Sequence, residues 1–207
     1  EVTLRGVLEP ENWTLLTTRH ASCVTPEVIG SLDLLILYRS AGWDALGFSP
    51  DAVAEHREPP GYFMTDALEQ AVVENVRRGM GLIVLHCAVY HPERRSYMDL
   101  LGIESVGKPG FDTKVSFENL ADHPVMNGVD AISPTYDQVW PVCCSQSVKP
   151  LFTISQGPSG VSAPAGWCRQ EGNGRVVVLT PGHKVDVYHS DAYKRVLLNA
   201  SKWAIEG

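Results

Sequence analysis

The chain has 207 residues, of which 44% are apolar and 20% charged, with a formal net charge of −7 and a pI near 5.5. Nonspecific binding to nucleic acid or to an anionic membrane needs a positive surface, so this acidic composition argues against both partners. No apolar run approaches the roughly 20 residues that a membrane-spanning helix needs. The length favours a single domain over residues 1–207.

The cysteines indicate reduced thiols. Their number is odd, and their spacing matches neither a disulfide framework nor a CxxC zinc motif. The adjacent pair Cys143–Cys144 has unfavourable geometry for a disulfide. Free thiols are typical of a cytoplasmic protein, where most of them serve as small buried hydrophobes. We therefore predict a cytoplasmic location, and we keep a homo-oligomer as an open alternative to a monomer. The five residues are Cys23, Cys87, Cys143, Cys144 and Cys168.

The first third of the chain contains two strand-like segments and one long loop. "WTLLTT" (13–18) predicts a short strand, and "SLDLLILYRS" (31–40) predicts a fully buried strand. Between them, Thr25 is placed to cap a short helix that begins at Pro26. Residues 41–64 are rich in Gly, Pro and aromatic residues and have no clear period. Long loops of this kind in compact domains are often functional.

The middle of the chain shows the clearest helix. "TDALEQAVVENVRRG" (65–79) has Thr65 as its cap, an apolar stripe at helical spacing, and Gly79 at its end. "GLIVLH" (81–86) follows at once as a second buried strand, and "HPERRSYMDLLG" (91–102) predicts another helix.

The last part of the chain predicts further strands and a final amphipathic helix. "GNG" is a turn that joins "GWCRQE" to "RVVVLTPGH" as a β-hairpin. The predicted strands are 112–119, 149–155, 164–170 and 175–180, and the helix is 190–207 with Ser190 as its cap.

Buried aliphatic strands that alternate with helices predict an α/β fold. We expect a mainly parallel sheet with helices on both faces and a late antiparallel hairpin. Ligands of such sheets bind beyond the carboxyl ends of the strands. Three polar segments follow predicted strand ends: "YRSAGW" (38–43), "HCAVYH" (86–91) and "TPGHKVD" (180–186). These segments are the expected site.

Several of these segments, in this order, resemble the ThuA-like (trehalose utilisation) family from about residue 65 to the end. The resemblance implies a flavodoxin-like three-layer fold that is related to class I glutamine amidotransferases. It also implies a role in carbohydrate catabolism, on trehalose, a related disaccharide or a keto-sugar. The segments are "RRGMGLIVLHCAVYHPERRSYMDLLG", "DHPVMNGVD", "YDQVW", "GWCRQEGNGRVVVLTPGH" and "LLNASKWA".

The sequence departs from the family pattern at three places. The opening "EVTLRGVL" looks like the helix after the family's first strand, so that strand is expected to be missing. The family's "DE" before an aromatic residue is Asp137–Gln138 here. A histidine that often follows "LLG" is not present in "GIESVGKPGF". These departures support a competing interpretation, a non-catalytic domain that serves binding or assembly.

Histidines at the strand ends give the first hypothesis for a site. His86 and His183 each end a predicted core strand, and His189 lies six residues beyond His183. Neutral imidazole is a common ligand of zinc and similar divalent metals. A metal site at His86, His183 and His189 is therefore one prediction, and hydrogen-bonded or surface histidines without metal are the alternative.

Cys87 gives the second hypothesis. In the amidotransferase-like fold a nucleophilic cysteine follows the third strand, a position close to Cys87, and His183 with Asp186 would complete the catalytic group. The sharp turn that presents such a nucleophile normally needs glycines, and "LHCAV" has none. A buried, unreactive thiol is the competing interpretation.

The third hypothesis is general acid–base work on a carbohydrate without metal. The titratable candidates are Asp137, Asp186, Glu118 and the strand-end histidines. Backbone amides freed by the turn at Gly182 could bind a sugar hydroxyl or an anion. Trp140 could add an aromatic surface, although packing in the core or in a lid is its simpler role. The predicted substrate-binding residues are Trp43, Tyr136, Gln138 and Gly182.

Overall fold

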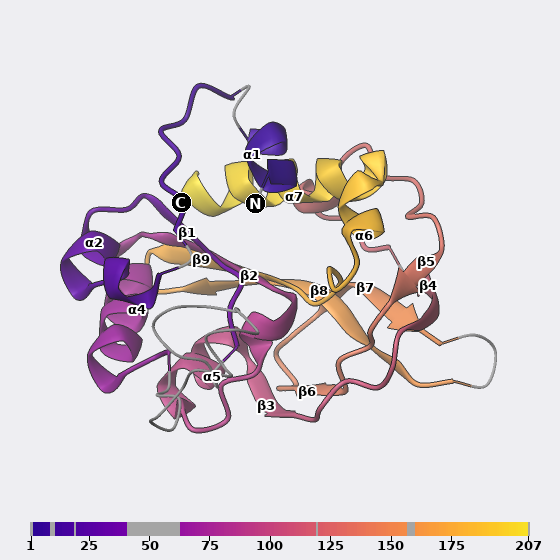
Figure 1. The fold of residues 1–207 in the computed structure, drawn as a ribbon, viewed down its shortest axis with the longest axis horizontal. Helices are drawn as coiled ribbons and strands as arrows, with labels where there is room; N and C mark the ends of the chain where they lie inside the picture. The colour runs from indigo at the N-terminus through magenta and orange to yellow at the C-terminus, as the bar shows by residue number, and fades with distance from the viewer. Residues whose placement is uncertain are drawn as a thin grey trace, which may run out of the picture.

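A computed structural model describes residues 2–8, 11–18, 20–40, 63–118, 120–156 and 160–206. Its main sheet has seven strands in the order β1-β2-β9-β8-β7-β4-β5. Helices lie on both faces (Figure 1). The strands are β1 (Leu34–Leu37), β2 (Gly81–Leu85), β4 (Thr113–Glu118), β5 (Thr135–Asp137), β7 (Pro150–Ser155), β8 (Ser162–Glu171) and β9 (Gly174–Leu179).

The expectation of a mainly parallel sheet is wrong. Only the pairs β1–β2 and β2–β9 are parallel, and the remaining pairs of the seven-stranded sheet are antiparallel. A parallel connection needs a crossover of a dozen or more residues, whereas few residues separate β7, β8 and β9 along the chain. The predicted hairpin is confirmed, since β8 and β9 pair up to Glu171 and Gly174. The sheet is therefore mixed and mostly antiparallel.

Two apolar clusters lie on the two faces of this sheet. In β2, Leu82 and Val84 pack into one cluster while Ile83 and Leu85 pack into the other, because successive side chains point to opposite faces. The first cluster contains residues of α2 (Pro26–Gly30), α4 (Asp66–Arg78) and α5 (Arg95–Leu101). The second contains residues of α6 (Val185–His189) and α7 (Asp191–Ile205), with α1 (Val2–Leu8) packed against it.

The strand connections include shorter elements. Two strands, β3 (Ile103–Val106) and β6 (Val142–Cys144), form a separate antiparallel pair. Three 3-10 helices are η2 (Ala21–Cys23), η3 (His86–Val89) and η4 (Pro124–Met126). None of the helices in the described part of the chain combines the length and the apolar character that crossing a membrane requires.

The capped helices are confirmed. Thr65 Oγ1 accepts a hydrogen bond from Leu68 N at 3.3 Å at the start of α4, and Ser190 Oγ accepts one from Tyr193 N at 3.4 Å at the start of α7. Two expectations are wrong. Residues 13–18 form no strand, and the helix expected from His91 begins only at Arg95. Residues 13–18 belong to neither of the described sheets, and at 91–94 the backbone forms a turn, closed by Arg94 N and the His91 carbonyl, before the helix begins. The apolar pattern alone is insufficient at both places.

Candidate functional site

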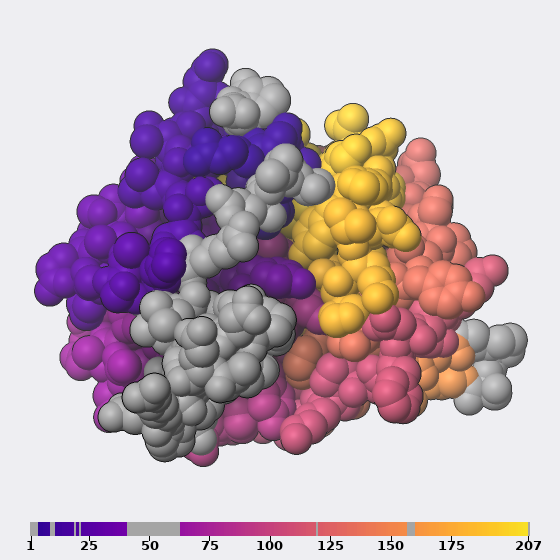
Figure 2. Space-filling view, viewed as in Figure 1, coloured from indigo at the N-terminus to yellow at the C-terminus, as the bar shows by residue number. Residues whose placement is uncertain are grey.

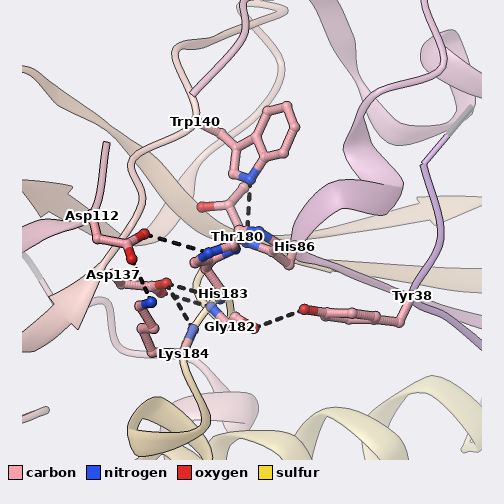
Figure 3. A network of polar contacts seen from close by, with 9 residues as sticks. All are labelled: Tyr38, His86, Asp112, Asp137, Trp140, Thr180, Gly182, His183 and Lys184. Carbon is pink, nitrogen blue, oxygen red and sulfur yellow. Dashed lines mark hydrogen bonds and ion pairs between the residues drawn. The ribbon is translucent and has the colours of Figure 1, made fainter. Parts of the chain in front are cut away.

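The carboxyl ends of the three parallel strands bring Tyr38, His86 and His183 together. Tyr38 follows β1, His86 follows β2, and His183 lies in the loop after β9. Because β1, β2 and β9 are adjacent and parallel, the segments that follow them meet at one edge of the sheet. Figure 3 shows these side chains in one network of polar contacts.

His86 stands at a sharp turn of the backbone. Its φ of 46° is left-handed, a conformation that non-glycine residues rarely adopt and that is frequent at functional positions. The turn ends β2 and starts η3, so the imidazole is placed at the strand end with only 3% exposure. The strained residue is His86 and not the neighbouring Cys87.

Burial keeps the His86 ring neutral at neutral pH. Burial lowers its pKa from 6.5 to about 4, against a smaller raising effect of the Thr180 carbonyl. Nδ1 lies 2.9 Å from the Thr180 carbonyl oxygen and 3.2 Å from the Trp140 indole nitrogen. One Nδ1 cannot donate to the carbonyl and also accept from the indole. We assign the proton to Nδ1 on the shorter contact, which leaves the lone pair on Nε2.

Three rings surround the His86 imidazole. Tyr38 stacks on it with ring centroids 5.9 Å apart and 22° between the planes. Trp140 meets it edge-on at 5.5 Å, and the His183 ring is tilted by 44° at 5.4 Å. Tyr38 remains 44% exposed and His183 has 39% of its side chain exposed, so this group of rings is open to solvent on one side.

Asp137 holds the loop that carries His183. Its carboxylate accepts hydrogen bonds from the backbone N–H groups of Gly182 at 2.7 Å, His183 at 2.8 Å and Lys184 at 3.3 Å. Burial raises the pKa of Asp137, and these amides act in the opposite direction. The amides that could have bound a sugar hydroxyl thus bind a carboxylate of the chain itself. Asp137 is fully buried and fixes the backbone of this loop.

The backbone carbonyls of the same loop also have side-chain hydrogen-bond partners. The Thr180 carbonyl faces His86 Nδ1, Tyr193 Oη donates to the Pro181 carbonyl at 2.9 Å, and Tyr38 Oη donates to the Gly182 carbonyl at 2.9 Å. Gly182 has a φ of 138°, which side chains rarely allow. The loop is therefore held at one conformation from several sides, and the position of His183 is set by it.

A second polar group lies next to His183. Asp112 places Oδ1 3.4 Å from His183 Nε2, and its other oxygen pairs with Lys184. The Lys184 hydrogen bond is the largest cause that lowers the pKa of Asp112, and the side chain of Gln138 also hydrogen-bonds to this carboxylate. Asp112 thus stays ionised beside an imidazole that it can orient.

Cys87 does not have the environment of an activated thiol. Burial raises its pKa to about 11, and the opposing effects of backbone hydrogen bonds and Arg39 are smaller. The nucleophilic form of cysteine is the thiolate, which is scarce near neutral pH at such a pKa. The geometry therefore favours His86 over Cys87 as the reactive residue of the turn.

The other predicted site residues are dispersed. Tyr136 is 60% exposed, and Glu118 Oε1 accepts a hydrogen bond from Ser155 Oγ at 2.8 Å. Asp186 and His189 are exposed on α6. Trp43 lies outside the described residues. Within the described ranges, no group of three or more His, Cys, Asp or Glu side chains is arranged to hold a metal ion.

Sequence reasoning missed Asp112 and Tyr188 and named Tyr38 and Lys184 only as parts of polar segments. On the face that Figure 2 shows, the C-terminal segment (yellow) lies between the N-terminal part (indigo) and the region of β4 and β5 (pink). Asp112 reaches His183 because β4 and β5 pair through Thr113 and Asp137. No local pattern around Asp112 could have indicated this contact.

Comparison with known proteins gives one family and several solved structures of similar fold. The family model described as "ThuA: Trehalose utilisation" matches residues 2–204. No curated protein matches the chain significantly. A ThuA-like protein from Bacteroides uniformis has a TM-score of 0.69 at 17% identity, covering 98% of this chain and 81% of that one. One from Parabacteroides merdae has a TM-score of 0.66 at 16% identity, covering 99% and 83%. A cytoplasmic protein from Salmonella typhimurium has a TM-score of 0.60 at 10% identity, covering 98% and 85%. These TM-scores establish a common fold.

Proposed function

The chain belongs to the ThuA (trehalose utilisation) family, and from this premise we propose that it binds a small carbohydrate at His86 and His183 and acts on it by acid–base chemistry. The observation that carries the proposal is the neutral, buried His86 at the end of β2, with its Nε2 lone pair free and three rings around it.

The lining of the site suits a sugar. Small-molecule sites combine aromatic surface with a few fixed polar groups, and here the rings of Tyr38 and Trp140 lie beside two imidazoles. The apolar face of a sugar ring can pack on such aromatic side chains, while its hydroxyls need donors and acceptors. Trehalose, a related disaccharide and a keto-sugar are the substrates that we propose.

The two histidines differ in a way that suits opposite roles. His86 is neutral and buried, so its Nε2 can accept a proton from a substrate hydroxyl or carbon acid. His183 is partly exposed and has Asp112 3.4 Å from its Nε2, so the carboxylate can orient this ring toward the open side of the site. We propose His86 as the base and His183, oriented by Asp112, as the acid.

A metal-free site fits the described residues better than a zinc centre. The two imidazoles could supply two nitrogen ligands, but a zinc site takes three or four protein ligands, and no such set exists among the described residues. The alternative of a site that binds sugar without turnover is favoured by one observation: the Asp137 carboxylate is engaged by backbone N–H groups of the loop and of Gln138.

Two broader proposals accompany this one. The left-handed residue directly after β2 supports a relation to the amidotransferase-like superfamily, whose reactive side chain sits at a strand-to-helix turn. The free thiols support a cytoplasmic location for a single-domain protein, and the name of the Salmonella relative agrees with it.

The proposal is tested by a thermal-shift and calorimetric screen with trehalose, maltose, sucrose and their keto derivatives. We expect at least one sugar to stabilise the protein and His86→Asn to abolish the effect, since asparagine tolerates the left-handed backbone but lacks the imidazole. His189→Asn, on the exposed end of α6, is the matched control and keeps the shift. Binding that is unchanged in His86→Asn contradicts the proposal. NMR of the bound sugar then separates an enzyme, which converts it, from a binding protein, which returns it unchanged.

A further inference from the structure

Tyr188 on α6 has a buried hydroxyl that finds no hydrogen-bond partner among the residues that the structure describes. The side chain is only 8% exposed and packs in the cluster beneath α7. Buried hydroxyls in folded proteins are nearly always hydrogen-bonded, so one without a partner calls for a physical explanation.

The hydroxyl lies directly against the loop that carries His183. A Cβ placed on Gly182 would be 2.3 Å from Tyr188 Oη, so only glycine leaves room for the phenol there. Tyr188 also interacts electrostatically with Tyr38, Asp137 and Cys87, which come from the ends of β1, β5 and β2. The unpartnered hydroxyl is thus placed among the residues of the site.

Tyr193 provides an internal comparison. Its ring is 5.8 Å from that of Tyr188, at 73°, and it is equally part of the core. Its hydroxyl donates to the Pro181 carbonyl at 2.9 Å. The carbonyls of Thr180 and Gly182 face His86 and Tyr38. Each of these three carbonyls therefore already has a side-chain partner, and none of them accepts a hydrogen bond from the Tyr188 hydroxyl.

We propose that the Tyr188 hydroxyl is a further substrate-binding residue, which donates a hydrogen bond to an uncharged oxygen, a hydroxyl or a carbonyl, of the bound carbohydrate. This inference rests on the proposed function. Burial raises the pKa of Tyr188, so the phenol keeps its proton as a donor at all ordinary pH values. Tyr38, which is 44% exposed, donates to the carbonyl of the same glycine and interacts with Tyr188, so the Tyr188 hydroxyl lies beside a solvent-exposed residue of the site.

The test compares Tyr188→Phe with Tyr193→Phe, because each removes one hydroxyl and keeps the ring. Without ligand, Tyr188→Phe should have an unchanged or higher melting temperature, since no hydrogen bond is lost. Tyr193→Phe should melt several degrees lower because it leaves the Pro181 carbonyl without its donor. In calorimetry with trehalose and its keto derivative, Tyr188→Phe should bind about tenfold more weakly, whereas His189→Asn, on the exposed end of α6, should bind as the unsubstituted protein does.

Three results overturn the inference. An equal fall of the melting temperature in the two variants shows that the Tyr188 hydroxyl makes a stabilising hydrogen bond within the protein. Unchanged sugar affinity in Tyr188→Phe shows that the hydroxyl does not contact the ligand, and the proposed function then stands without it. Failure of the unsubstituted protein to bind any tested sugar removes both the inference and the proposed function.

Discussion

The two halves of the main sheet contribute differently to the site. At the carboxyl ends of the parallel half, β1, β2 and β9, lie three rings of the candidate site, namely Tyr38, His86 and His183. The antiparallel half ends in β4 and β5, whose neighbourhood supplies Asp137 under the loop and Asp112 beside His183. One half supplies the rings of the candidate site, and the other supplies the carboxylates that hold the His183 loop and contact the His183 ring. The antiparallel extension therefore sets the position of a side chain that follows the parallel half, His183.

The largest expected effect is a loss of stability at acid pH that arises in the parallel half. Burial lowers the pKa values of His86 and His91 from 6.5 to about 4 each. The unfolded chain then takes up protons first as the pH falls, so stability is full above pH 6.5 and declines as the pH approaches 4. Each histidine accounts for a loss of up to about 3 kcal/mol in the free energy of unfolding over this pH range.

Urea unfolding at pH 7 and pH 4.5 measures this decline. In His86→Asn we expect a smaller loss of stability between pH 7 and pH 4.5, with the contribution of His91 retained. A pH dependence that is the same in the variant would mean that His86 is not buried and neutral in the native state.

The next effect concerns the antiparallel half. Asp137→Asn should cost about 3 kcal/mol, because an amide cannot accept all the hydrogen bonds from Gly182, His183 and Lys184 and brings donors of its own against them. Asp186→Asn on the exposed surface of α6 should change the free energy of unfolding by less than about 0.5 kcal/mol. Equal costs for the two variants in urea unfolding would remove the positioning role of Asp137.

A smaller effect is expected at the glycine where the two halves meet. Gly182→Ala should cost about 2 kcal/mol, since φ is 138° and the new Cβ would meet Tyr188 Oη. Gly6→Ala in α1 is the matched change in a helix with open space around it, and it should stabilise by about 0.5 kcal/mol. Thermal unfolding of both variants measures the difference, and a neutral Gly182→Ala would contradict the tight loop.

The smallest effect is expected at Cys87. With a pKa raised to about 11, its thiol should react more slowly with iodoacetamide near neutral pH than the exposed Cys23 and Cys143. Mass spectrometry of labelled peptides measures the rates. Cys87→Ala should also keep sugar binding, and a fast-reacting Cys87 would revive the hypothesis of a cysteine nucleophile.

The sequence predicted what depends on local pattern. The caps Thr65 and Ser190, the β8–β9 hairpin and the strand end before His86 all follow from signals within a few residues, whereas β9 ends at Leu179, before the predicted end at His183. The direction of β7 could not be read from its apolar pattern, because a strand buried on both faces looks the same in a parallel or an antiparallel sheet. The short connections around β8 did contain that information.

The candidate site was predicted only in part, because some of its contacts join residues that lie far apart in the chain. His86 and His183 follow parallel strands, so their meeting could be expected from the fold. Asp112 meets His183 only through the pairing of β4 with β5, a contact between residues far apart in the chain. The left-handed φ of His86 and the partnerless hydroxyl of Tyr188 are likewise properties of the folded backbone and packing, which no spacing of residues encodes.

The central claim is that His86 is a neutral imidazole that faces a bound carbohydrate. Nitrogen-15 NMR of histidine-labelled protein at pH 7, titrated with trehalose and its keto derivative, tests it most directly. The account predicts a neutral His86 with its proton on Nδ1, an Nε2 resonance that shifts with added sugar, and an unaffected His189. A protonated His86, or resonances that stay in place while the sugar binds, would contradict it.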